Sequence, residues 1–214
     1  MAGDAMILCD IGNTNATFLD EGKISRMSVE QFSAYEPKER VYFICVNDEI
    51  LKKLKKNKLF VDLEPHFELD TIYQGLGVDR VAGCYAVSDG VIVDAGSAIT
   101  VDIMSNSIHL GGYILPGIAS MLKAYESISP RLKLPINSQI DIDALPQKTV
   151  DAISYGILKP IVTLLEKLAG SKKVYFTGGD GEFLSKFFKN AICDKMLVFR
   201  AMQKLINQKK EILK

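Results

Sequence analysis

Short apolar runs alternate with turn residues and with stretches of helical periodicity along this chain, a pattern typical of α/β folds. Apolar runs bounded by Gly, Asn or Asp predict strands, and these fall at residues 6–11, 15–20, 23–29, 41–46, 60–64, three runs within 90–117, 173–177 and 196–199. Helical periodicity predicts helices at residues 48–57, 80–87, 117–126, 147–169, 181–189 and 200–213. Pro160 lies inside the longest of these, where it is expected to kink the helix or mark a boundary.

Two segments of the chain resemble each other. Residues 7–24, "ILCDIGNTNATFLDEGKI", and residues 91–108, "VIVDAGSAITVDIMSNSI", each read as strand, Asp, turn, strand, turn and the start of a third strand. The aligned pairs are Asp10 with Asp94, Gly12 with Gly96 and Asn13 with Ser97. The repeat predicts two related α/β domains, at residues 1–89 and 90–214. A coincidental pair of hairpins stays open as the alternative.

The two repeated turns have the composition of a phosphate site. Gly and small polar residues after a strand turn backbone N–H groups outward, which forms an anion-binding concavity. A carboxylate at the strand end, such as Asp10, suits Mg²⁺, which prefers oxygen ligands. The motifs G-x-x-x-x-G-K-[ST] and, after a strand, G-x-G-x-x-G are absent from the sequence.

A third element, "FTGGD" at residues 176–180, follows another predicted strand. Glycines at positions 178 and 179 let a flat group such as adenine or ribose approach the backbone, because no Cβ intervenes. The alternative is an ordinary strand-to-helix turn with Asp180 as the helix N-cap.

Composition narrows the function classes. Lys+Arg and Asp+Glu both total 26, so charge gives no reason to expect nucleic acid or an anionic membrane as partner. The lysines of "LKKLKKNK" at residues 51–58 are expected on a solvated helix face. Four dispersed cysteines and two histidines argue against a disulfide framework, a zinc site or a Ser/His/Asp triad.

No apolar stretch approaches the ~20 residues of a membrane span and no signal peptide is visible, so a cytoplasmic location is expected. Whether residues 1–5 are native stays open.

An ordered set of motifs carries a resemblance over nearly the whole chain: "DIGNT", "YQGLGVDR", "VIVDAGSAITVD", "GGYILPG" and "TGGD". The chain resembles the type III pantothenate kinases, a family of the sugar kinase, Hsp70 and actin superfamily. The resemblance implies an α/β fold of two ribonuclease H-like (actin/hexokinase-type) domains with mixed sheets and a nucleotide cleft between them. It also implies phosphorylation of pantothenate by ATP, the first step towards coenzyme A, by a homodimer that needs Mg²⁺ and a monovalent cation, K⁺ or NH₄⁺.

The resemblance implies an ATP site in three segments. The first phosphate loop would comprise Asp10, Ile11, Gly12, Asn13, Thr14, Asn15, Ala16 and Thr17, with Asp10 placing Mg²⁺. Ser97 would offer a hydroxyl to ATP, at a position where Thr is more usual in the family. Gly178 and Gly179 would lie against the nucleotide, and Asp94 would bind the monovalent cation.

The resemblance also implies a pantothenate site. In "GLGVDR", Asp79 would be the general base and Arg80 a substrate-positioning cation, with Gly77 and Val78 beside them. Tyr73 would contact pantothenate, and Thr149, in the T-x-x-A-x-x-x-G helix, would reach it across the dimer interface. The alternatives are that Asp79 is an ordinary helix N-cap, that Arg80 forms a surface ion pair, and that Tyr73 and Thr149 are packing residues. The segment between Asp79 and Asp94 is shorter than in longer family members, which affects the expected pocket wall.

Two other functions compete with this one. A related kinase of the superfamily would phosphorylate a sugar, an acetate-like acid or another alcohol. A non-catalytic transcriptional accessory factor would bind pantothenate or a nucleotide, although it would have no use for a general base at Asp79.

Overall fold

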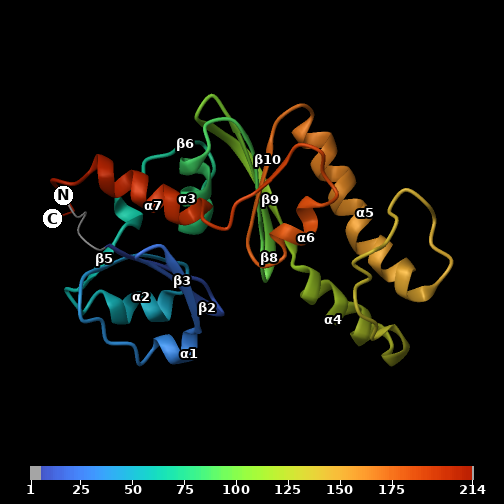
Figure 1. The fold of residues 1–214 in the computed structure, drawn as a ribbon, viewed down its shortest axis with the longest axis horizontal. Coiled ribbons are helices and arrows are strands. Elements are labelled where there is room, and N and C mark those ends of the chain that lie inside the picture. The colour runs from blue at the N-terminus through green and yellow to red at the C-terminus, as the bar shows by residue number, and fades with distance from the viewer. Residues whose placement is uncertain (1–5, 214) are drawn as a thin grey trace. The chain divides into compact units, whose positions relative to one another are not determined.

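A computed structural model describes residues 6–213 of the chain. By its internal contacts the described chain divides into two units. The first takes in the residues up to Ala86 together with the segment from Met196 onward, and the second is Val87–Lys195. Each unit is built on its own mixed sheet with helices (Figure 1).

The sheet of the first unit has the strand order β3-β2-β1-β4-β5. Its strands are β1 (Ile7–Ile11), β2 (Asn15–Asp20), β3 (Lys23–Ser28), β4 (Val41–Cys45) and β5 (Phe60–Asp62). The first three form an antiparallel meander, while β4 runs parallel to β1 and β5 parallel to β4. These strands confirm the ones predicted between residues 6 and 64, with the last shorter than expected.

Helices cover both faces of this sheet. They are α1 (Val29–Phe32), α2 (Asp48–Leu54), α3 (Val78–Ala86) and α7 (Leu197–Gln208), with a 3₁₀ turn η1 (Glu64–His66) and a two-residue strand β6 (Asp70–Thr71) between them. Leu8 packs in a cluster with residues of α3 and α7, whereas its neighbour Cys9 packs in a second cluster with residues of α1 and α2. Because successive side chains of a strand point to opposite faces, β1 is buried on both sides. All five lysines within residues 51–58 are exposed, as predicted.

The C-terminal segment differs from the prediction in two ways. Residues 196–199 were expected to form a strand, and this is wrong, because α7 begins at Leu197. The buried positions of α7 recur with a helical period, at Leu197, Val198, Phe199, Ala201, Met202, Leu205 and Ile206. These side chains pack with α3, so the closing helix groups with the first unit, although the expected boundary at 89/90 assigned it to the second.

The sheet of the second unit repeats that of the first. Its strands are β7 (Gly90–Ala95), β8 (Ala98–Ser105), β9 (Ile108–Pro116), β10 (Val174–Thr177) and β11 (Ala191–Cys193). Within the unit they run in the order β11-β10-β7-β8-β9, again an antiparallel meander with two parallel strands added beside its first strand. A chance likeness of two hairpins does not explain a shared order of five strands. The strand β11 is not among the predicted ones.

The helices of the second unit are α4 (Ile118–Ile128), η2 (Pro130–Leu132), α5 (Thr149–Ala169) and α6 (Gly181–Ser185). Of the two expectations for Pro160, a kink or a boundary, the boundary is wrong, because α5 is a single helix across it. Buried side chains on both sides of the proline, among them Ile157 and Leu165, pack against β7, β8 and β10 and hold the helix together. Among the residues from 6 to 213, no helix is long and apolar enough to cross a membrane.

Candidate active site

The first hairpin turn lies at the carboxyl end of β1. Asp10 is half-buried there and pairs with Thr17 of β2 on one side and Ile44 of β4 on the other. The Gly12 N–H donates to the Asn15 carbonyl oxygen at 2.9 Å, which closes the turn. Residues 13 and 14 are exposed at its tip. A carboxylate and a polar turn therefore share one end of this strand.

The second hairpin turn lies at the end of β7 and is one residue shorter than the first. Asp94 pairs with Thr100 of β8 and Thr177 of β10, and the Gly96 N–H donates to the Ala98 carbonyl oxygen at 2.9 Å. Ser97 is exposed at its tip. Asp10 and Asp94 thus correspond in their place, next to last in β1 and in β7, although the two hairpins differ in length by one residue.

The backbone of Gly178 lies against the side chain of Asp94. Gly178 has a φ of +82°, and a Cβ at this position would lie 2.3 Å from Asp94 Oδ1 and 2.5 Å from the Ala95 carbonyl oxygen. The Asp180 N–H donates to that same oxygen at 2.9 Å. The "TGGD" turn therefore lies directly against Asp94. A side chain at position 178 would prevent this close approach. A Cβ at Gly179, by contrast, would meet no atom within 4 Å.

Gly117 is a site residue that the sequence analysis missed. Its N–H donates to the Ser97 carbonyl oxygen at 3.0 Å, and a Cβ there would lie 2.3 Å from the Gly96 carbonyl oxygen. Gly117 thus fixes the second turn from the start of α4. The signal was the Pro-Gly pair at the end of "GGYILPG", which marks a strand end and a helix start.

Asp180 has the position of a helix N-cap, which was its alternative role, but does not act as a cap through its side chain. Asp180 stands at the N-cap of α6, but its side chain makes no capping hydrogen bond. Burial raises the pKa of its carboxyl above the ordinary value.

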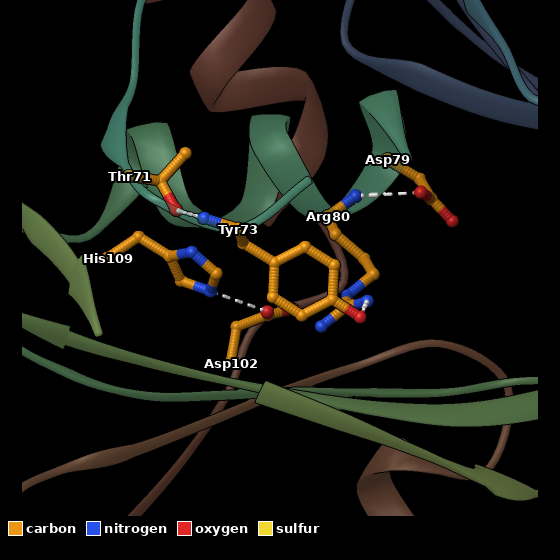
Figure 2. A network of polar contacts seen from close by, with 6 residues as sticks. All are labelled: Thr71, Tyr73, Asp79, Arg80, Asp102 and His109. Atoms are coloured by element: carbon orange, nitrogen blue, oxygen red, sulfur yellow. Dashed lines mark hydrogen bonds and ion pairs between the residues drawn. The ribbon is translucent and has the colours of Figure 1, made fainter. Parts of the chain in front are cut away.

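Asp79, Arg80 and Tyr73 lie together in the first unit (Figure 2). The Arg80 guanidinium is 5.0 Å from the centroid of the Tyr73 ring, and its Nη1 donates to the Tyr73 hydroxyl at 3.4 Å. Arg80 is buried, so the alternative of a surface ion pair does not hold. The Tyr73 N–H donates to Thr71 Oγ1 at 3.0 Å, which fixes the segment that carries the ring.

Asp79 is not the N-cap of α3. The first helical hydrogen bond runs from the Val81 N–H to the Gly77 carbonyl oxygen at 3.0 Å, so Gly77 precedes the helix and Asp79 is its second residue. Asp79 Oδ1 accepts from the Arg80 N–H at 2.8 Å. A Cβ on Gly77 would lie 2.7 Å from this oxygen, so the glycine leaves room for the carboxylate.

Thr149 is the first residue of α5 and is exposed. Because the Thr149 side chain is exposed, it does not serve as a packing residue, which was its alternative role. Lys148, at the N-cap, makes no side-chain capping hydrogen bond.

A buried polar pair in the second unit was also missed. His109 Nε2 and Asp102 Oδ1 are 2.9 Å apart on adjacent strands β9 and β8, and both side chains are almost fully buried (Figure 2). The two residues lie on different strands of a meander, and a β-bulge between Ile103 and Met104 shifts the register of these strands, which the sequence did not indicate.

Comparison with known proteins places the chain in a family. The family described as type III pantothenate kinase matches residues 46–171. A type III pantothenate kinase of Campylobacter jejuni strain RM1221 is 55% identical over 208 residues, which are 97% of this chain and 100% of the relative. The chain belongs to the type III pantothenate kinase family.

Solved structures agree with the fold expected for a type III pantothenate kinase. A Campylobacter jejuni protein described as belonging to the Baf family of transcriptional activators is 53% identical with a TM-score of 0.91, over 97% of this chain and 100% of that one. MreB5 of Spiroplasma citri bound to ADP has 11% identity and a TM-score of 0.54 over 96% of this chain and 97% of its own, which is a likeness of fold alone. The expected α/β fold with two ribonuclease H-like domains of the actin and sugar kinase type is confirmed.

Proposed function

We propose that this chain phosphorylates pantothenate with ATP, giving 4'-phosphopantothenate in the first step of coenzyme A biosynthesis. The observation that carries the proposal is the 55% identity, along 97% of the chain, to a relative named type III pantothenate kinase. The reaction needs a general base, an electrostatic site for the phosphates and a site for the alcohol, and each has candidate residues in the described chain.

Asp79 is the proposed general base. Its carboxylate accepts the proton of pantothenate's primary hydroxyl as that oxygen attacks the γ-phosphorus in line and ADP leaves. Base catalysis of this kind typically contributes ~10²–10⁴-fold to the rate. The contact of Oδ1 with the Arg80 N–H at 2.8 Å supports the role, because it fixes the carboxylate's direction.

Residues of both hairpins and of the turn after β10 are proposed to hold ATP. They are Asp10, Ile11, Gly12, Asn13, Thr14, Asn15, Ala16, Thr17, Ser97, Gly178 and Gly179. Turn amides and hydroxyls stabilise negative charge on the phosphoryl oxygens, the largest contribution in phosphoryl transfer.

Two cations fit the donor atoms of these turns. The half-buried Asp10 carboxylate at the end of β1 suits Mg²⁺, which when bound neutralises phosphate charge. Asp94 Oδ1 and the Ala95 carbonyl oxygen both face the glycine backbone at residue 178, and this all-oxygen set suits K⁺ or NH₄⁺.

Pantothenate is proposed to lie against Tyr73, Gly77, Val78 and Arg80. The Arg80 guanidinium, held by the Tyr73 ring and hydroxyl, supplies a positive charge for the pantothenate carboxylate. The protein is proposed to act as a homodimer in the cytoplasm, with Thr149 of the partner subunit completing this site.

The test is ADP release measured with ATP, Mg²⁺ and K⁺, with and without pantothenate, and with a panel of sugars, acetate and other alcohols. The proposal predicts turnover that depends on pantothenate, with the phosphorylated product identified by mass. Turnover with a panel compound and none with pantothenate would contradict it and favour a related kinase.

The second candidate is a transcriptional accessory factor, favoured by the description of the 53% identical Campylobacter jejuni structure. This function predicts binding to promoter DNA that pantothenate or ATP changes, without turnover. The equal totals of basic and acidic residues, 26 each, give DNA no electrostatic attraction to the whole chain.

A further inference from the structure

The residue before Thr149 does not cap the first turn of α5 with its side chain. The N-cap residue Lys148 makes no side-chain hydrogen bond to the helix, although the first N–H groups of a helix have no partners within it. Thr149 itself is exposed. The direction of this side chain therefore depends on how the rest of the first turn is held.

Asn137, from the segment between η2 and α5, makes three hydrogen bonds, two of them to the beginning of α5. Its Nδ2 donates to Asp151 Oδ1 at 2.8 Å, and its backbone N–H donates to Ser154 Oγ at 2.8 Å. Its Oδ1 accepts from the Gln139 N–H at 2.9 Å, which fixes the amide's orientation. The half-buried Asn137 thus uses both ends of its side chain and its own backbone.

Ser154 completes the attachment. It is fully buried, and its Oγ donates to the Val150 carbonyl oxygen at 2.9 Å while it accepts from Asn137. Both polar functions of the buried hydroxyl are therefore satisfied, and losing one of these partners would leave a buried polar group unpaired.

The geometry of the helix separates the anchored face from the exposed one. With 3.6 residues per turn, Asp151 and Ser154 lie on neighbouring positions of one face, whereas Thr149 is about 200° around the helix from Asp151. The hydrogen bonds from Asn137 therefore reach one face of α5, and Thr149 stands on the opposite face. An acidic side chain in the first turn of a helix, such as Asp151, is also favoured by the helix dipole.

We propose that Asn137, through Asp151 and Ser154, is a positioning residue that sets the first turn of α5 and so directs Thr149 towards pantothenate. The inference rests on the role proposed above for Thr149. It adds residues for which the motifs gave no role and which do not themselves touch the substrate.

The test uses reversal of the amide–carboxylate pair. N137D sets two carboxylates against each other, D151N retains an acceptor for the Asn137 amide, and N137D/D151N restores one amide and one carboxylate with their places exchanged. Q139A is the matched control, because Gln139 takes part only through its backbone N–H. The measurements are the KM for pantothenate, the KM for ATP, and amide hydrogen exchange in the first turn of α5.

For N137D we expect the pantothenate KM to rise about tenfold, the order of one lost hydrogen bond to a charged group, with the ATP KM unchanged. D151N should change the pantothenate KM little, and the double variant should return it to within about twofold of the wild type. Q139A should leave the pantothenate KM unchanged. Hydrogen exchange of the first turn should rise in N137D and fall again in the double variant. Exchange is read without substrate, so it tests the anchor even if the wild type proves not to phosphorylate pantothenate.

Three results would overturn the inference: unchanged exchange in N137D, raised exchange with an unchanged pantothenate KM, or equal rises in the KM values for pantothenate and ATP. A wild type without pantothenate kinase activity, by contrast, would remove the proposed function and with it the link to substrate.

Discussion

Replacing Gly178 by alanine tests the closest approach in the second unit. At φ +82° an alanine occupies the left-handed region, which costs ~1–2 kcal/mol. Its Cβ would also lie 2.3 Å from Asp94 Oδ1 and 2.5 Å from the Ala95 carbonyl oxygen. Because the second contact is with backbone, the turn must move, and overpacking of this kind costs ~1–3 kcal/mol. The free energy of unfolding should therefore fall by about 2–5 kcal/mol.

Thermal unfolding followed by calorimetry measures this loss. A fall in Tm of roughly 5–15 °C is expected for a chain of this length. The control is G179A, next along the chain, where a Cβ meets nothing within 4 Å and no left-handed φ is required. Its Tm should stay within about 2 °C of the wild type. Equal Tm values for the two variants would refute the reasoning, because the same substitution would then cost the same with and without the contact.

Three further predictions rest on single sites. G77A should leave Tm nearly unchanged but lower kcat, because the new methyl group, 2.7 Å from Asp79 Oδ1, can be relieved by rotating that carboxylate; an unchanged kcat would show that the direction of the carboxylate does not matter. Turnover should be low in Na⁺ alone and recover with K⁺, and equal rates in the two salts would remove the proposed cation site at Asp94. Burial raises the pKa of the Cys45 thiol to about 11, so at pH 8 a thiol reagent should modify the exposed Cys193 and spare Cys45 until the chain unfolds, which mass spectrometry of peptides can follow; early modification of Cys45 would contradict its burial.

Much of the fold was predictable because its elements are short and sharply bounded. The glycines and polar residues after β1 and β7 mark the strand ends, and the repeat predicted that the two meanders share a plan. The start of α7 was not predictable in the same way. Met196 provides no side-chain cap, and the apolar residues 196–199 fit a short strand as well as the first turn of a buried helix. The grouping of α7 with α3 depends on packing between segments far apart in sequence, which periodicity does not report.

The sequence motifs predicted the residues of the candidate site but not the contacts that hold these residues in place. The structure brings Asp94, Ser97 and Gly178 together within one unit, and Tyr73, Asp79 and Arg80 within the other. The supports are close backbone approaches and hydrogen bonds across many residues, such as Gly117 to the Ser97 turn and Asn137 to α5. A sequence motif does not show such contacts, because each depends on a distance that only the folded chain defines.

The measurement that tests the central claim most directly is pantothenate-dependent ADP release by D79N beside the wild type, with ATP, Mg²⁺ and K⁺. The substitution keeps the size of the side chain and an oxygen that can accept from the Arg80 N–H, so Tm should change little. We predict that kcat falls by ~10²-fold or more, as for loss of a general base. A folded D79N with the wild-type kcat would contradict this role for Asp79.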